Sequence, residues 1–174
     1  CEPLISRSFE VARAYRFLKG SGLPLRIPVI EMVEIGAGGG SIAGLDALRQ
    51  IAVGPRSAGS DPGPACYDRG NEDATVTDAD VVMGRINPAS FAGGKITLAP
   101  EKSEAAIAAA IGEPLGLSND IAAAGVDEIV NENMANAARV HAIEHGKDTA
   151  DRTLVAFGGA APLHAARLAD KLGI

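Results

Sequence analysis

The sequence has no tryptophan, and its aromatic residues are two tyrosines and four phenylalanines. It also lacks an excess of basic residues, because 16 lysines and arginines face 22 aspartates and glutamates and give a net charge of -6. Nucleic-acid binding needs basic side chains for the phosphates, and single strands also need aromatic rings on which bases can stack. The composition therefore argues against a nucleic-acid partner.

Long apolar runs and cysteines are also scarce. No stretch approaches the roughly 20 apolar residues needed to cross a bilayer, so no membrane partner is expected. Two cysteines, Cys1 and Cys66, are too few for a disulfide framework, and a reducing cytoplasm is the expected location. Because the chain begins Cys-Glu-Pro without an initiator methionine, we expect a piece of a longer protein.

The hydrophobic fraction of 47% over 174 residues is enough for the core of one domain or part of one. Apolar runs with β-branched members predict strands early in the chain, and helical spacing dominates later. We therefore expect an α/β fold, strand-rich in its N-terminal half and helical in its C-terminal half, as a single partial domain over 1–174. The predicted strands are 6–17, 27–35, 41–46 and 50–53, and a proline- and glycine-rich loop follows at 54–67. Helices are predicted to begin at the cap Thr77, at Pro100 and at the cap Ser118. The last of these helices has an apolar stripe that includes Val126 and Val130, and Gly125 within it predicts close packing or a kink.

The last quarter of the chain has the pattern of a strand, a glycine turn and a helix. Thr153–Phe157 is a short apolar run, and helical spacing extends from Pro162 to Leu172. Between them lie Gly158, Gly159, Ala160 and Ala161. A helix N-terminus leaves backbone N–H groups unpaired, and glycine lets a flat or anionic ligand approach the backbone closely. This turn is a candidate binding site, and the alternative is an ordinary strand-to-helix connection that binds nothing.

A second glycine turn follows the predicted strand 27–35. Its candidate binding residues are Gly38, Gly39, Gly40 and Ser41. Consecutive glycines weaken regular structure by roughly 0.5–1 kcal/mol each unless the backbone needs them, which predicts a ligand close to this backbone. Two alternatives stay open: a dinucleotide-binding G-x-G-x-x-A pattern with Asp61 as its acid, and a glycine hairpin that serves chain geometry alone.

Four other residues carry chemistry but have simpler interpretations. Cys66 could be a nucleophile or a ligand, but a lone cysteine without a nearby histidine is most often a packing residue. Asp78 follows Thr77 at a helix start, which favours capping over catalysis. His141 and His145 match the H-x-x-E-H pattern of zinc peptidases, but no third ligand is indicated. We therefore predict no metal-binding residue, and the catalytic residues are not identified.

Taken together, four segments closely resemble the hydantoinase A/5-oxoprolinase family in order and spacing. The resemblance covers nearly the whole chain, and no single motif carries it. The segments are Val33–Ala43 around the first glycine turn, Val53–Tyr67 in the loop, Thr75–Ala79 at the helix start and Phe157–Ala165 around the second glycine turn.

The resemblance implies an actin-like ATPase fold, in which two ribonuclease-H-like halves surround a nucleotide cleft. A strand–Gly-Gly–helix turn lies against the adenosine of ATP in that superfamily, which implies this role for Gly158, Gly159 and Ala160. Family members use ATP, with Mg²⁺, to open cyclic amides such as hydantoins and 5-oxoproline by phosphorylating the carbonyl oxygen. Relatives are subunits of ketone carboxylases, and a hydantoinase B-type partner subunit is implied.

Two departures from the family pattern limit what this chain is expected to do alone. Ala161 stands where the family usually has glycine, which adds a methyl group beside the implied adenosine site. The family's N-terminal phosphate loop and a further C-terminal portion have no counterpart here. This piece is therefore predicted to bind ATP weakly or not at all, and calorimetric titration giving low-micromolar affinity would contradict that.

Overall fold

The computed structural model describes residues 5–7, 9–11, 20–30 and 32–174, and its contacts divide the chain into two units, Cys1–Glu34 and Ile35–Ile174. Whether both belong to one partial domain of a longer protein stays a prediction. The described residues include no helix long and apolar enough to cross a membrane.

The first unit contains two small antiparallel ladders. Strand β1 (Ile5–Ser6) pairs with β4 (Val29–Ile30), and β2 (Phe9–Val11) pairs with β3 (Leu23–Leu25). The strand predicted over 6–17 is therefore seen as parts of β1 and β2, and its residues 12–17 lie outside the described ones. Of the strand predicted over 27–35, residues 29–30 form β4 and residue 31 lies outside the described ones. Residues 27–28 and 32–35 form no strand, because a strand forms only where its backbone faces a paired neighbour.

The second unit begins with a β-hairpin. Strand β5 (Ser41–Leu45) runs antiparallel to β6 (Ile51–Ser57), with Gly44 opposite Ala52. The Asp46 carboxylate closes the turn by accepting hydrogen bonds from two backbone N–H groups beyond it. The two short strands predicted here are confirmed. The dinucleotide-binding interpretation of the preceding glycines is wrong, because a strand follows them where that motif needs a helix.

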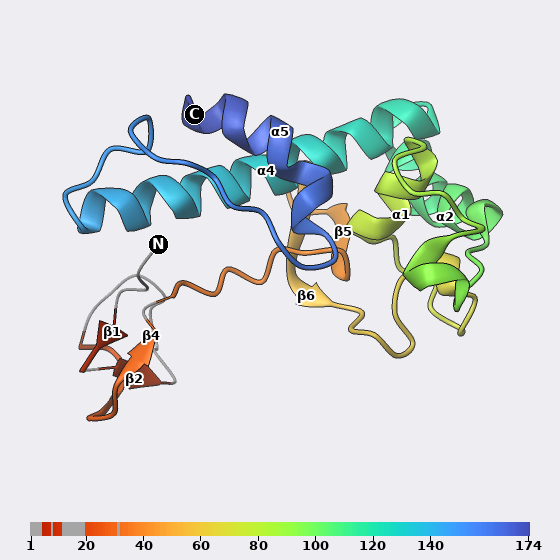
Figure 1. Cartoon of the computed structure of the whole chain (residues 1–174). Helices are drawn as coiled ribbons and strands as arrows, with labels where there is room; N and C mark the ends of the chain where they lie inside the picture. Colours follow the sequence, from red (N-terminus) through yellow and green to blue (C-terminus); the bar gives the residue numbers. More distant parts are fainter. Residues whose placement is uncertain (1–4, 8, 12–19, 31) are drawn as a thin grey trace. The chain divides into compact units, whose positions relative to one another are not determined.

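The remaining regular structure of the second unit is helical, with loops between the helices (Figure 1). The long helix α4 (Asn119–Glu144) packs against α1 (Val76–Val82), α2 (Pro100–Ile107) and α5 (Ala161–Leu172). The remaining elements are the short helices η1 (Ala65–Tyr67) and η2 (Phe91–Gly94), the π-helical turn η3 (Ala108–Gly112) and α3 (Glu113–Leu115). All described strands precede residue 58 and all α-helices follow residue 75, so the predicted α/β order is confirmed.

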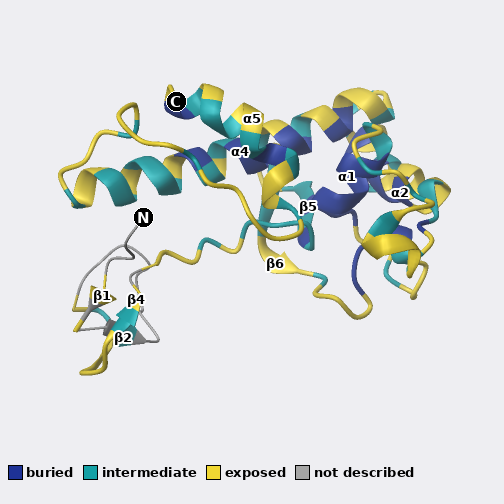
Figure 2. Ribbon diagram, viewed as in Figure 1, coloured by how far each residue is buried: buried dark blue, intermediate teal, exposed yellow. Residues whose placement is uncertain are grey.

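The core of this unit lies where α1, α2 and α4 meet the hairpin, and Figure 2 shows the buried residues concentrated there. Val126 and Val130 of α4 are fully buried, as their place in the predicted apolar stripe requires. Gly125 allows the close approach expected of it, because a Cβ built there would lie 2.5 Å from the Cδ1 atom of Ile51. The hairpin therefore sits directly on α4.

The helix ends follow local capping chemistry. Ser118 caps α4 as predicted, with its hydroxyl accepting a hydrogen bond from the N–H of Ile121. The prediction that Thr77 caps α1 is wrong by two residues: Thr75 is the N-cap and forms a capping box with Asp78. Helix α5 covers the predicted 162–172, whereas the helix predicted from Pro100 changes to π-helical geometry after Ile107.

The strand predicted at Thr153–Phe157 is wrong. These residues have no regular structure, and Val155 and Phe157 are 67% and 82% exposed. Branched and aromatic residues favour a strand only when a neighbouring strand pairs with the backbone and covers the side chains, and no described strand pairs here. The predicted strand–turn–helix is therefore an extended segment, a turn and a helix.

Candidate functional site: two glycine turns that meet

The first glycine turn is held by Ser41. Its hydroxyl donates to the carbonyl oxygen of Gly36 and accepts from the N–H of Gly38, both at 3.0 Å. The N–H of Ser41 in turn donates to the carbonyl oxygen of Gly38. Because Ser41 is only 3% exposed and its hydroxyl is used within the turn, it shapes the backbone and is not a free ligand-binding group.

The three glycines of this turn have different surroundings. A Cβ built on Gly39 would lie 2.5 Å from the Oγ1 atom of Thr77, and one on Gly40 would lie 3.0 Å from the Oγ atom of Ser57. Neighbouring protein atoms therefore leave no room for a side chain at either position, which agrees with the alternative that the glycines serve chain geometry. A Cβ on Gly38 would meet nothing within 4 Å, so the open side of the turn is at Gly38.

The second glycine turn is open over two residues. Added Cβ atoms on Gly158 and Gly159 would meet nothing within 4 Å, and Gly158 has a φ of +96° that favours glycine. The turn leads into α5, whose N-cap Ala160 has no side chain to satisfy the first N–H groups. Ala161 is exposed beside it. The bare backbone and uncapped helix end suit a flat or anionic ligand.

The structure brings the two turns together. The Cβ built on Gly39 lies 3.7 Å from the Cβ atom of Ala160, although the two residues are about 120 positions apart in the sequence. In Figure 1 the start of α5 lies beside β5 and α1. Gly38 and Gly159 directly adjoin these two residues in the chain, so the two turns lie next to each other.

Asp78 anchors the loop that leads from β6 to α1. Its carboxylate is fully buried and accepts five hydrogen bonds. The donors are the backbone N–H groups of Ala65, Cys66 and Thr75 and the hydroxyls of Thr75 and Ser103. The predicted capping role is confirmed, and Asp78 also fixes the far end of the proline- and glycine-rich loop.

Cys66 is a packing residue, as expected. Its side chain is fully buried in a small cluster with Val81 and Leu98. Burial, reinforced by the nearby Asp78 carboxylate, raises the pKa of the thiol to about 12. The reactive thiolate is therefore almost absent at neutral pH.

This state of Cys66 predicts slow alkylation. Iodoacetamide at pH 8 should leave the peptide that contains Cys66 unmodified in the native protein and modify it after unfolding in urea. Peptide mapping by mass spectrometry measures both states in one preparation. Rapid modification of the native protein would show that the thiol is accessible and ionised.

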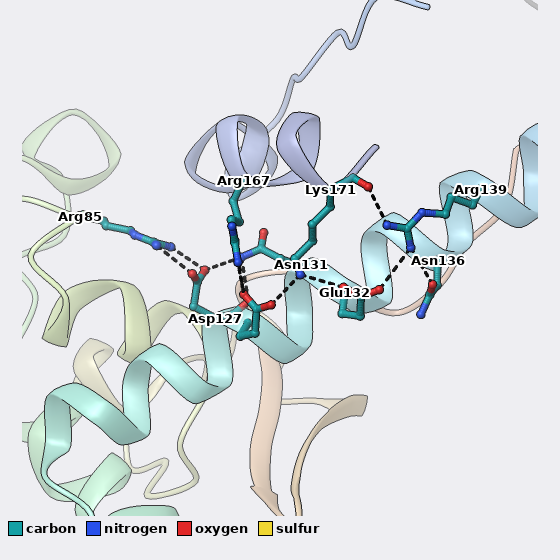
Figure 3. Close-up of polar contacts among 9 residues, drawn as sticks. Arg85, Asp127, Asn131, Glu132, Asn136, Arg139, Arg167 and Lys171 are labelled. Carbon is teal, nitrogen blue, oxygen red and sulfur yellow. Dashed lines mark hydrogen bonds and ion pairs between the residues drawn. The ribbon is translucent and has the colours of Figure 1, made fainter. Parts of the chain in front are cut away.

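A buried polar cluster was missed by sequence reasoning. Asp80 of α1, Asp127 of α4 and His164 of α5 are nearly or fully buried, and one carboxylate oxygen or ring nitrogen from each lies within 4.8 Å of the other two. Arg85 binds Asp127 through two hydrogen bonds of 2.5 and 2.8 Å, and Asn131 donates to the same carboxylate at 2.8 Å, as Figure 3 shows. Burial opposes ionisation of Asp127, but the hydrogen bonds from Arg85 outweigh it and lower its pKa.

The sequence carried a faint signal of this cluster. Asp127 and Asn131 are four residues apart and directly follow Val126 and Val130 of the apolar stripe, where a polar side chain needs a buried partner. His164 stands one turn before Leu168 on the apolar side of the last helix. Each position fitted an ordinary helix, so pattern alone did not bring the three elements together.

His141 and His145 lie at the end of α4, with ring centroids 4.4 Å apart. The Nδ1 atom of His145 is 2.7 Å from the carbonyl oxygen of His141, which is a local helix-end contact. Among the described residues, they belong to no group of three possible metal ligands. The pair therefore gives no support to the zinc-peptidase interpretation.

Helix α5 is also fixed to α4 by surface ion pairs (Figure 3). The ammonium group of Lys171 lies 2.6 Å from Glu128 and 2.7 Å from Glu132. Arg167 also pairs with Glu128, at 3.1 Å. Hydrogen bonds from Lys171 hold the pKa values of both glutamates below their usual range. Such exposed pairs contribute little individually, but together they orient the helix behind the second glycine turn.

Proteins similar to this chain include enzyme subunits and two solved structures of ATP-dependent enzymes. The chain is 44% identical over 147 residues to the caprolactamase subunit alpha of Pseudomonas jessenii, covering 84% of this chain and 21% of that protein. It is 47% identical over 145 residues to the acetophenone carboxylase gamma subunit of Aromatoleum aromaticum, covering 83% and 20%. The crystal structure of the ATP-dependent caprolactamase from Pseudomonas jessenii matches with a TM-score of 0.80 and 41% identity, covering 93% and 23%.

The chain spans about a fifth of the length of these relatives. The profile of the family described as Hydantoinase/oxoprolinase matches residues 2–174, which is nearly all of the sequence. The resemblance inferred from the four sequence segments is confirmed. This chain belongs to the hydantoinase/oxoprolinase family.

Proposed function

We propose that this chain is part of an ATP-dependent enzyme that opens cyclic amides, and that its two glycine turns hold the nucleotide. The observation that carries the proposal is the contact distance of 3.7 Å between the Gly39 position and Ala160, with open space at Gly38, Gly158 and Gly159. Gly38 and Gly159 have neither a protein neighbour nor a positive φ that requires glycine, and glycine costs conformational entropy unless something needs the bare backbone. The similarity to an ATP-dependent caprolactamase supports ATP as that ligand.

The residues present fit the nucleotide. The open backbone of Gly158 and Gly159 suits the flat adenosine, and the uncapped N-terminus of α5 places positive dipole charge nearby. The backbone at Gly38 would face the phosphates, with the turn kept rigid by the Ser41 hydroxyl. When bound with Mg²⁺, ATP would supply the phosphoryl group that activates the amide carbonyl oxygen. This chain's role is to bind and orient the nucleotide.

We extend the proposal to the whole protein. The hairpin and helices would form part of an actin-like ATPase fold, with the rest of the nucleotide cleft outside these 174 residues. Because the similar proteins are named as subunits alpha and gamma, a hydantoinase B-type partner subunit would complete the enzyme. The cytoplasm is the compartment in which such an enzyme meets ATP.

A second candidate is a subunit of an ATP-dependent ketone carboxylase. The specific observation in its favour is the 47% identity to the acetophenone carboxylase gamma subunit, beside 44% for the caprolactamase subunit alpha. The nucleotide site would be the same in both cases. The acceptor of the activated group would differ, and it would be chosen by residues outside the two glycine turns.

The two candidates are separated by the substrate that stimulates ATP hydrolysis. The full-length protein is prepared with its partner subunit and supplied with Mg²⁺ and ATP. One series of assays adds hydantoin, 5-oxoproline or caprolactam, and the other adds acetophenone plus bicarbonate. Release of phosphate that rises severalfold with one cyclic amide supports the first proposal. A rise with ketone and bicarbonate alone supports the second, and hydrolysis indifferent to both overturns both in favour of a non-catalytic nucleotide-binding module.

A further inference from the structure

The imidazole ring of His164 lies between two buried carboxylates. It is fully buried one helical turn after Ala160, between α1 and α4. Its Nε2 atom is 3.6 Å from the Oδ2 atom of Asp80, and its Nδ1 atom is 3.2 Å from the Oδ1 atom of Asp127. Neither ring nitrogen makes a hydrogen bond of ordinary geometry, and the Oδ2 atom of Asp80 has no partner either.

The contacts of this ring require one more proton than a neutral His164 and an ionised Asp80 carry. The Asp127 oxygen can only accept, so the Nδ1 atom of His164 must carry a hydrogen toward it. The Nε2 atom would then present a lone pair to the lone pairs of the Asp80 carboxylate, which is unfavourable in a site without water. A second proton placed between these two atoms removes the repulsion. Burial raises the pKa of Asp80, which favours retaining that proton.

A metal ion fits the same atoms less well. The two oxygens of Asp127 already accept hydrogen bonds from Arg85, and one of them also accepts from Asn131. A divalent cation would lie beside the Arg85 guanidinium, which also approaches Asp80 at 3.4 Å. With one shared proton, the charges of Asp80, Asp127, Arg85 and His164 sum to zero, which is the balance that a buried cluster needs.

We propose that Asp80 and His164 share one proton and that this buried link positions the turn Gly158–Ala160 beside the turn at Gly39. This role as positioning residues rests on the proposed ATP site. The link has a direct route to each turn. Asp80 lies one helical turn after Thr77, whose N–H donates to the carbonyl oxygen of Gly39 at 2.8 Å, and His164 lies one turn after Ala160.

The variant Asp80→Asn tests the shared proton directly. Its amide oxygen can accept from Arg85 while its NH₂ group donates to the Nε2 atom of a neutral His164, so the link needs no proton from solution. The wild-type link must lose its proton as the pH rises, whereas the variant link must not. Arg85 faces the pair 3.4 Å from Asp80, and Asp127 faces it 3.2 Å from His164. Asn131 reaches the pair only through its hydrogen bond to Asp127.

The experiment uses the full-length protein with its partner subunit over a pH series. The Kd for ATP is measured by titration, and the unfolding temperature by calorimetry without ATP. In the wild type, the unfolding temperature should fall and the Kd for ATP should rise at high pH. For one linked proton, the Kd should rise by up to about tenfold per pH unit. For Asp80→Asn, the Kd and the unfolding temperature should not change over the same pH range. His164→Leu should bind ATP poorly at every pH. Asp73→Asn, the same change at an exposed site, should follow the wild type.

Each outcome decides one part. If the unfolding temperature of the wild type depends on pH no more than that of Asp80→Asn, the shared proton is overturned. It is also overturned if elemental mass spectrometry detects one equivalent of bound metal that Asp80→Asn loses. A pH-dependent unfolding temperature with unchanged Kd overturns the positioning role and leaves the proton in place. A wild-type protein that binds no ATP at any pH, while its unfolding temperature still depends on pH, defeats the proposed ATP function and not the shared proton.

Discussion

Replacing Asp78 by alanine should lower the free energy of unfolding by about 3–5 kcal/mol, the largest stability effect expected in this chain. The substitution removes both acceptor oxygens from a fully buried site and leaves five donors without a partner. It also removes the capping box that begins α1. Urea denaturation of the wild type and the variant measures the difference.

Two matched variants make the result specific to these contacts. Asp78→Asn keeps one acceptor oxygen and the side-chain volume, so its loss should be clearly smaller. Asp73→Ala makes the same truncation at an exposed carboxylate and should change the stability by less than about 0.5 kcal/mol. Equal losses for Asp78→Ala and Asp73→Ala would mean that the buried hydrogen bonds do not hold the loop.

Replacing Gly159 by valine should weaken ATP binding by the full-length protein at least about tenfold, because two methyl groups would fill the space that the nucleotide needs. A loss of about 1.4 kcal/mol corresponds to that factor. A Cβ at Gly159 meets no protein atom within 4 Å, and its backbone does not require glycine, so the fold should tolerate the change. Gly158 is a poorer test because its φ of +96° would strain any side chain.

Gly44→Val is the matched control for this variant. Gly44 also has open space around an added Cβ and needs no positive φ, but it lies within β5 and outside both turns. It should therefore bind ATP as the wild type does. Fluorescence titration with an ATP analogue measures all three proteins, and an unchanged Kd for Gly159→Val would remove the second turn from the nucleotide site.

Local chemistry could be predicted from the sequence where neighbouring residues decide the structure. Ser118 caps its helix, the hairpin forms around the Asp46 turn, and Asp78 caps as expected, because each depends on contacts a few residues away. The predicted cap was Thr77, whereas the residue that caps the helix is Thr75. Both are threonines, and in the structure the Thr77 side chain packs against Gly39, which lies in a distant turn.

Structure that depends on distant partners could not be predicted in the same way. Thr153–Phe157 has the composition of a strand, but a strand also needs a paired neighbour, and composition does not show whether one lies within these 174 residues. The cluster of Asp80, Asp127 and His164 joins three helices that are far apart in the sequence. Each glycine turn was predicted separately as a binding site, and only the fold brings the two turns together.

The most direct test is a structure of the full-length protein with a non-hydrolysable ATP analogue and Mg²⁺. We expect the adenosine to lie in van der Waals contact with the backbone of Gly158 and Gly159, and the phosphates to lie toward Gly38. A nucleotide bound elsewhere, with side chains of the remaining protein filling the space beside both turns, would contradict the account.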